Sequence, residues 1–126
     1  MIIVHGVFPV FKDQRSRALL LMQEMAAASR LEAGCVSYEF YASLTEPCQF
    51  LLFQEWASVD ALQDHFETVH MENFLEQLPE ILDGKIVTRR YEVRQQSGRS
   101  TRPDASEPDS DLLVREPEVS VPKIIH

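Results

Sequence analysis

Short apolar segments alternate with amphipathic segments along the first 95 residues of the chain. Residues 2–8 form an apolar, β-branched run that ends before Pro9, a pattern typical of a buried strand. Side chains alternate between the two faces of a strand. One face of this strand should therefore carry Ile3, His5 and Val7, and the other Ile2, Val4, Gly6 and Phe8.

Apolar residues then recur at intervals of three and four, which predicts a helix that Asp13 caps and that ends near Leu31. Gly34 follows at a position where glycine commonly stops a helix, because it tolerates the left-handed conformation. The predicted buried positions of the helix are Ala18, Leu21, Met22, Met25, Ala26 and Ala28.

Residues 35–43 and 49–56 are rich in aromatic and β-branched residues and predict the two strands of a hairpin. In the first strand, one face should carry Val36, Tyr38 and Phe40, and the other Cys35, Ser37, Glu39 and Tyr41. The pattern then predicts a Ser58-capped helix over 59–67 with Leu62, Phe66 and Val69 buried. After a break at 68–70, a helical stretch carries Phe74, Leu75 and Leu78 until Pro79 and then Asp83-Gly84 end it, and residues 85–94 form the last strand.

This order of elements, strand-helix-strand-strand-helix-strand, predicts an α+β fold with a ferredoxin-like antiparallel sheet and helices on one face. Large apolar residues occupy both faces of the strands, for example Leu52 and Phe53. An antiparallel sheet with one face in water would alternate more regularly. We therefore expect a homodimer in which two sheets meet face to face as a dimeric α+β barrel, with a sheltered cavity beside Trp56 under the helices.

Composition divides the chain into a domain of residues 1–95 and an acidic tail of residues 96–126, which holds four of the seven prolines and is expected to be disordered. Docking of residues 119–125 as an added edge strand is the less favoured alternative. A net charge of −8 with scattered basic residues argues against nucleic acid as a partner. No apolar run approaches the roughly 20 residues of a membrane span, and the N-terminus lacks a signal-peptide pattern, so we expect a cytoplasmic protein with free thiols at Cys35 and Cys48.

The candidate chemistry lies in residues 56–70, which contain the single tryptophan and two of the four histidines. On a continuous helix, the five-residue spacing of His65 and His70 would separate the two imidazoles, so a metal site is only weakly supported. The break near Val69 instead allows both histidines to line the mouth of a cleft under the helices. Trp56 is either a packing anchor or a pocket wall. His5 is either a satisfied core histidine or a base, and Tyr38 can offer a hydroxyl to a pocket.

Residues 1–95 resemble the antibiotic biosynthesis monooxygenase family, also called the quinol monooxygenase-like family of dimeric α+β barrels. The matching segments are residues 32–39 (EAGCVSYE), residues 47–53, Glu55-Trp56 through Ala61-Leu62, His65 and His70-Met71. The resemblance implies oxidation of a quinol-like or polycyclic aromatic small molecule by O2 without any cofactor. It also implies catalytic roles for His65 and His70 and a substrate contact for Trp56. Tyr38 and His5 are further candidates for substrate binding because of their positions on the predicted strands.

Three other functions remain open from the sequence. Some relatives with the same pair of histidines resemble isomerases of a small phosphorylated hydroxyketone, which would need an arginine such as Arg89 or Arg90 in the pocket. Heme-degrading relatives use an asparagine on the first strand, where this chain has His5-Gly6, and that departure argues against heme cleavage. A non-catalytic module that binds a reactive small molecule is the third alternative.

Overall fold

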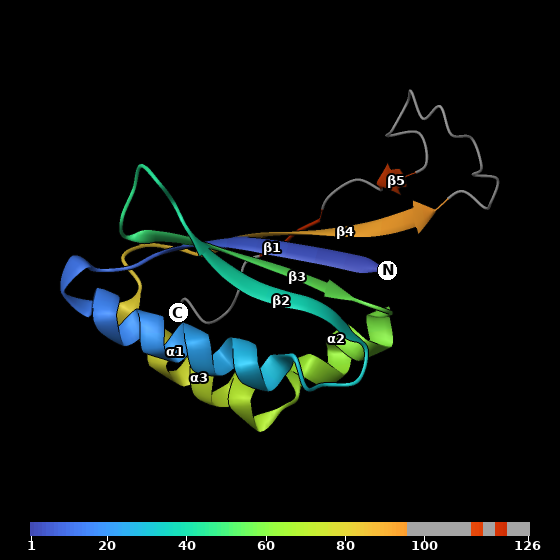
Figure 1. The fold of residues 1–126 in the computed structure, drawn as a ribbon, viewed down its shortest axis with the longest axis horizontal. Coiled ribbons are helices and arrows are strands. Elements are labelled where there is room, and N and C mark those ends of the chain that lie inside the picture. Colours follow the sequence, from blue (N-terminus) through green and yellow to red (C-terminus); the bar gives the residue numbers. More distant parts are fainter. Residues whose placement is uncertain (96–111, 115–117, 121–126) are drawn as a thin grey trace.

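The computed structural model describes residues 1–95, 112–114 and 118–120 (Figure 1). Four long strands form an antiparallel sheet in the order β2-β3-β1-β4. They are β1 (Ile2–Pro9), β2 (Cys35–Ala42), β3 (Gln49–Trp56) and β4 (Val87–Gln95). The central position of β1 and the antiparallel pairing confirm the predicted α+β, ferredoxin-like arrangement.

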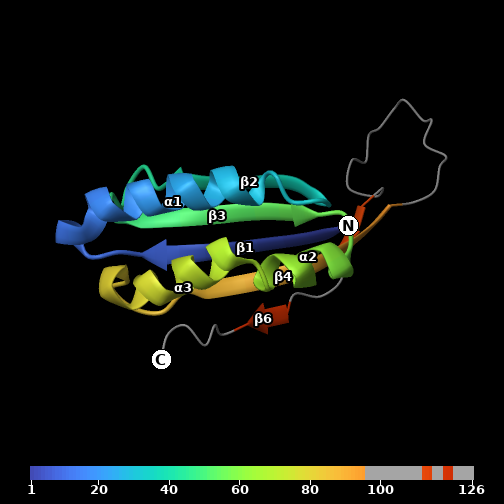
Figure 2. The same ribbon diagram turned by 90° about the horizontal axis from the view of Figure 1, so that it is seen from below.

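Three helices cover one face of this sheet (Figures 1 and 2). They are α1 (Arg15–Ser29), α2 (Val59–Phe66) and α3 (Val69–Ile81), and a short 3-10 helix, η1 (Lys12–Gln14), leads into α1. Seen from the helix side, α1 lies over β2 and β3, whereas α2 and α3 lie over β1 and β4 (Figure 2). None of the helices in the described ranges is long and apolar enough to cross a membrane.

Two three-residue strands of the C-terminal region, β5 (Leu112–Val114) and β6 (Glu118–Ser120), pair antiparallel with β4. Figure 2 shows β6 beside β4, at the edge of the sheet. The predicted added strand over 119–125 overlaps β6 at residues 119 and 120, and residues 121–125 lie outside the described ranges. The predicted disorder of the tail likewise falls mainly on residues outside those ranges and stays a prediction.

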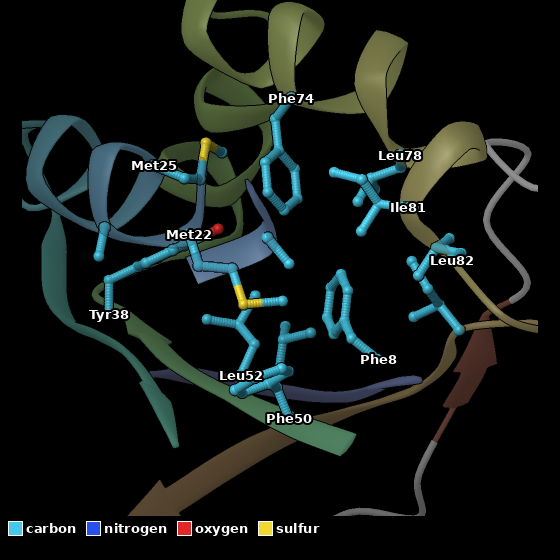
Figure 3. Packing of buried hydrophobic residues seen from close by; sticks show 14 of the residues in the cluster. Phe8, Met22, Met25, Tyr38, Phe50, Leu52, Phe74, Leu78, Ile81 and Leu82 are labelled. Carbon is cyan, nitrogen blue, oxygen red and sulfur yellow. The ribbon is translucent and has the colours of Figure 1, made fainter. Parts of the chain in front are cut away.

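The core lies between the helices and the sheet (Figure 3). The predicted parity of β1 is correct, because Ile2, Val4 and Phe8 are buried on the helix side while the residues between them are half-buried. Large side chains from every layer meet there, including Met22, Phe50, Leu52, Phe74, Leu78 and Ile81. The face of the sheet that the helices leave uncovered carries partly exposed apolar side chains such as Leu51 and Val87.

Two local predictions around α1 and β2 are wrong. Asp13 lies inside η1 instead of capping α1, whose N-cap is Gln14 without a side-chain hydrogen bond. Val36 is 52% exposed because the register of β2 against β3 shifts between Cys35 and Ser37, which is the geometry of a β-bulge. The bulge inserts one residue, and Cys35 consequently packs against the core although it was assigned to the opposite face.

Two predictions for the second helical region also need correction. Phe66 and Val69 are 50% and 71% exposed, and the buried residues of α2 are Ala61, Leu62 and His65. At about 100° per residue, residue 66 lies outside the sector of the helix surface that Ala61, Leu62 and His65 occupy. Pro79 lies inside α3, which continues to Ile81, because a proline close to the C-terminal end removes only one hydrogen bond of the helix.

Candidate active site

A single carboxylate oxygen connects the two histidines predicted to be catalytic. Oε2 of Glu32 lies 2.8 Å from Nδ1 of His65 and 2.6 Å from Nε2 of His70. An ionised carboxylate only accepts hydrogen bonds. Both imidazoles must therefore donate an N–H to Glu32, which defines the tautomer of each ring and leaves an acceptor lone pair on the other nitrogen.

The break between α2 and α3 brings the two histidines together. His65 lies in the last turn of α2, and His70 lies in the first turn of α3. Thr68 makes the connection: its hydroxyl donates to the carbonyl of His65 (2.8 Å) and accepts from the amide of Met71 (3.2 Å). The hydroxyl thus satisfies polar groups at the end of one helix and the start of the next. The two rings consequently lie with centroids 6.0 Å apart.

Glu32 reaches the histidines from the turn between α1 and β2. Gly34 in this turn has a φ of +86°, a conformation that residues with a Cβ rarely adopt. Its carbonyl accepts a 2.8 Å hydrogen bond from the amide of Ala57, which ties the turn to the start of α2. This hydrogen bond therefore holds the turn that carries Glu32 close to α2, the helix that carries His65.

The three side chains differ in exposure: the exposed fractions are 1% for His65, 12% for Glu32 and 28% for His70. Burial lowers the pKa of His65 below its ordinary value, and the hydrogen bond to Glu32 opposes the shift only in part. His65 is therefore neutral near pH 7. Its Nε2 is buried and has no hydrogen-bond partner among the described residues.

Two aromatic side chains surround His65. The ring centroids of Trp56 and Tyr38 lie 4.7 Å and 5.4 Å from the centroid of its imidazole. The indole N–H of Trp56 donates to Oε1 of Gln54 at 2.7 Å, so this buried donor is satisfied. Tyr38 points into the core beneath α1 (Figure 3), and burial raises the pKa of its hydroxyl although the neighbouring Ser29 side chain opposes the shift. The hydroxyl stays protonated at physiological pH.

A groove of about 220 Å³ runs between α1 and α3 and reaches His70. Its walls are Leu21, Glu24 and Met25 of α1 and His70, Asn73, Phe74, Glu76 and Gln77 of α3. The lining thus combines apolar side chains with two carboxylates, two amides and one imidazole. A molecule in this groove can contact His70 directly and His65 only through Glu32.

The structure brings together four of the five predicted site residues: Trp56, Tyr38, His65 and His70. His5 lies on the opposite face of the sheet, where its ring stacks on Tyr91 at 5.4 Å. The sheltered cavity expected beside Trp56 is filled. Trp56 and His65 have no more than 1% of their surface exposed, which leaves no room for a water molecule beside them.

Sequence reasoning missed the role of Glu32, which was noted only as part of a matching segment. Glu32 lies two residues before Gly34. The glycine indicated a turn there, and a turn that needs glycine fixes the direction of the neighbouring side chains. The expected break between the helices does bring the two histidines together. It places one ligand-type atom from each of Glu32, His65 and His70 within 4.8 Å of one another, a cluster that the five-residue spacing supported only weakly.

The two arginines considered for phosphate binding lie on opposite faces of β4. The register places Arg89 opposite His5, on the face away from the helices, and Arg90 opposite Val4, on the helix side. Neither side chain lines the groove at His70. The groove instead carries the carboxylates of Glu24 and Glu76, which would repel an anion.

Comparisons with known proteins identify a family for this chain. Residues 1–77 match the sequence profile described as "Antibiotic biosynthesis monooxygenase". The chain is 35% identical over 92 residues to the uncharacterized protein sll1783 of Synechocystis, a match that covers 73% of this chain and 63% of that protein, less than two thirds of its length. It is 26% identical over 93 residues to "Putative monooxygenase YcnE" of Bacillus subtilis, covering 74% of this chain and 98% of YcnE.

Solved structures show the same fold. The structure of Rv0793 from Mycobacterium tuberculosis superimposes with a TM-score of 0.70 at 27% identity, covering 77% of this chain and 98% of Rv0793. An antibiotic biosynthesis monooxygenase crystal structure superimposes with a TM-score of 0.67 at 20% identity, covering 70% of this chain and 93% of the other. At that identity the second likeness concerns the fold alone.

Proposed function

The chain belongs to the antibiotic biosynthesis monooxygenase family, and from this premise we propose that it is a cofactor-independent monooxygenase that oxidises a quinol-like or polycyclic aromatic small molecule with O2. The observation that carries the proposal is the pair of hydrogen bonds from His65 and His70 to one oxygen of Glu32. A carboxylate that orients an imidazole and stabilises its protonated form is a common arrangement for a general base.

His70 is the base in this proposal, because it lines the groove whereas His65 is fully buried. Its Nε2–H donates to Glu32, so its Nδ1 can accept a proton from an acidic O–H or C–H of the substrate. The imidazolium that forms remains hydrogen-bonded to the Glu32 carboxylate. His65 and Trp56 hold Glu32 and the surrounding wall in position and do not contact the substrate.

The deprotonated substrate supplies the electrons for the reaction. For an anthrone, the carbanion gives its electrons to O2 and a carbon–oxygen bond forms. Loss of water from the resulting hydroperoxide leaves a carbonyl group at the former CH2. One oxygen atom thus enters the product and the other leaves as water, and no external reductant is consumed.

The groove also limits the size and charge of the substrate. Its volume of about 220 Å³ is below the roughly 300–1,000 Å³ of typical ligand pockets, which favours two or three fused rings over a larger polycycle. The side chains of Leu21, Met25 and Phe74 offer apolar contact, and Asn73 and Gln77 can bind hydroxyl groups. The carboxylates of Glu24 and Glu76 argue against a phosphorylated ligand.

Oxygen consumption with menadiol and with anthrone tests the proposal. We expect a rate above the buffer blank that falls by about 10²–10⁴-fold in His70→Ala, the usual contribution of a general base. Glu39→Gln, a change at an exposed carboxylate outside the groove, should keep the wild-type rate. A rate equal to the blank with both substrates, or an unchanged rate in His70→Ala, would contradict the proposal.

We also propose that the protein forms a two-fold homodimer through the sheet face that the helices leave uncovered. Partly exposed apolar side chains continue across this face on neighbouring strands, at Tyr41 (52%), Leu51 (37%) and Val87 (49%). Tyr41 pairs with Leu51 across β2 and β3, so the two side chains adjoin. A stable monomer at low micromolar concentration in sedimentation velocity would contradict the dimer.

A further inference from the structure

We propose that Glu32, His65 and His70 also form a binding site for a divalent transition-metal ion of the zinc class. Their candidate ligand atoms, one carboxylate oxygen and two imidazole nitrogens, all lie within 4.8 Å of one another. Two histidines and one glutamate, with the remaining positions open to water, form a ligand set found in catalytic zinc sites. The inference goes beyond the proposed oxidation and does not depend on it.

The present spacing of the three groups is that of hydrogen bonds. The two N···O distances are 2.8 Å and 2.6 Å. Ligands at about 2.0–2.1 Å from a tetrahedral ion lie roughly 3.3 Å apart. The two N···O distances must therefore widen by about 0.5 Å and 0.7 Å, and the two nitrogens, which lie within 4.8 Å of one another, must adopt the same spacing around the ion.

Side-chain adjustment can provide this widening. Glu32 belongs to the turn between α1 and β2 and not to a helix or strand. The side chain of His70 is 28% exposed beside the groove, so it has room to rotate. His65 is fully buried between Trp56 and Tyr38 and would act as the fixed ligand.

The ligand types and the surrounding charge select the class of ion. Imidazole nitrogens suit Zn²⁺, Co²⁺, Ni²⁺ and Fe²⁺, whereas Mg²⁺ and Ca²⁺ prefer sets made of oxygen. Two neutral imidazoles and one carboxylate would leave one positive charge on the complex. The carboxylates of Glu24 and Glu76 in the adjoining groove favour the approach of a cation.

The surroundings of His65 limit the expected affinity. A metal at Nδ1 requires the ring proton to move to Nε2, which is buried without a partner among the described residues. Metal-bound histidines normally donate this second N–H to an acceptor, and loss of such a contact weakens binding by roughly 10–100-fold. We therefore expect dissociation constants on the order of micromolar. A metal at Nε2 of His70 would likewise require the ring proton of His70 to move to Nδ1. Nδ1 could then no longer accept a proton from the substrate.

Titration of the chelator-treated, full-length protein with Co²⁺ tests the site through the visible absorption of the bound ion, and Zn²⁺ is followed by calorimetry. We expect one equivalent to bind, with affinity reduced at least 10-fold in Glu32→Gln and in His70→Ala. Glu39→Gln is the matched control, because this carboxylate is half-exposed and pairs with Arg30, and it should bind as the wild type does.

Absence of binding at millimolar Co²⁺ and Zn²⁺ would overturn the proposal, as would equal affinity in the wild type and both site variants. Circular dichroism of His70→Ala distinguishes a loss of metal binding from a loss of folding. The side chain of His70 is 28% exposed, so the fold should tolerate its replacement. The titration needs no substrate, and oxygen consumption is measured on the metal-free protein. The two proposals can therefore fail separately.

Discussion

Glu32 and His65 are 33 residues apart in the chain, yet Oε2 of one lies 2.8 Å from Nδ1 of the other. This contact joins the turn after α1 to the last turn of α2, two segments that β2 and β3 separate in the chain. It allows a polar ring to occupy a position with 0% exposed surface. Glu32 should therefore matter for stability as well as for chemistry.

Replacing Glu32 by alanine should lower the free energy of unfolding by about 1–3 kcal/mol, because the buried Nδ1–H of His65 loses its acceptor. Urea unfolding at pH 7 measures the change. The matched control is Glu39→Ala, which removes an ion pair with Arg30 in which both side chains are about half-exposed, and should cost less than about 1 kcal/mol. Equal losses in the two variants would show that the contact with His65 contributes no more than a surface pair.

Within residues 1–95, two glycines have a positive φ, and Gly34 should be the less replaceable of them. A Cβ at residue 34 would lie 2.5 Å from the Cβ of Ala61, whereas a Cβ at Gly84 would lie 3.6 Å from Pro9, an ordinary contact. Gly84→Ala should cost only the backbone strain of about 1–2 kcal/mol. Gly34→Ala should add an overpacking cost of about 1–3 kcal/mol and should shift the turn that carries Glu32. Thermal unfolding of both variants measures the difference, and a ranking in the opposite order would contradict it.

The sequence predicted the order of the elements because hydrophobic periodicity is a local property. The alternation along β1 and the Ser58 cap of α2, which accepts from the amide of Ala61, were both correct. The errors arose where a tertiary contact overrides the pattern. The exposed Phe66 was assigned to the core in preference to the polar His65, which is buried only because Glu32 arrives from another part of the chain.

Only part of the candidate site could be predicted from the sequence. Trp56, His65 and His70 were selected because they cluster in the sequence, and they do lie together. The groove is formed between α1 and α3, and no local pattern shows how two helices far apart in the sequence are spaced. For the same reason the sequence did not indicate that the space beside Trp56 would be filled by side chains.

The proposed dimer predicts that a charge on the uncovered sheet face separates the subunits. Leu51→Lys places an ammonium among Tyr41, Val7 and the copies that would face them, and burying an unpaired charge costs several kcal/mol. Leu44→Lys is the control, because Leu44 is 100% exposed in the hairpin loop. Sedimentation velocity should show monomers for Leu51→Lys and dimers for Leu44→Lys. A dimer that persists in Leu51→Lys would place the interface elsewhere.

Tyr38 should make the protein sensitive to alkaline pH. Burial raises the pKa of its hydroxyl above the ordinary value of 10.0, so the folded state keeps this proton at a pH where the unfolded chain releases it. The stability associated with the neutral hydroxyl is complete below pH 10 and is lost as the pH rises above that value. At pH 11, one unit above the ordinary tyrosine pKa, the hydroxyl is mostly ionised in the unfolded chain. This ionisation should lower the free energy of unfolding by about 1.4 kcal/mol.

Tyr38→Phe isolates this effect from the other titrating groups. At pH 8 the hydroxyl is protonated in both the folded and the unfolded wild type, so the stability difference between the two proteins at this pH is the reference. Between pH 8 and pH 11 the wild type should lose about 1.4 kcal/mol more than the variant does. Chemical unfolding at both pH values measures the difference. Parallel losses in the two proteins would mean that the hydroxyl ionises as readily in the folded state as in the unfolded chain, which is incompatible with a phenol buried beneath α1.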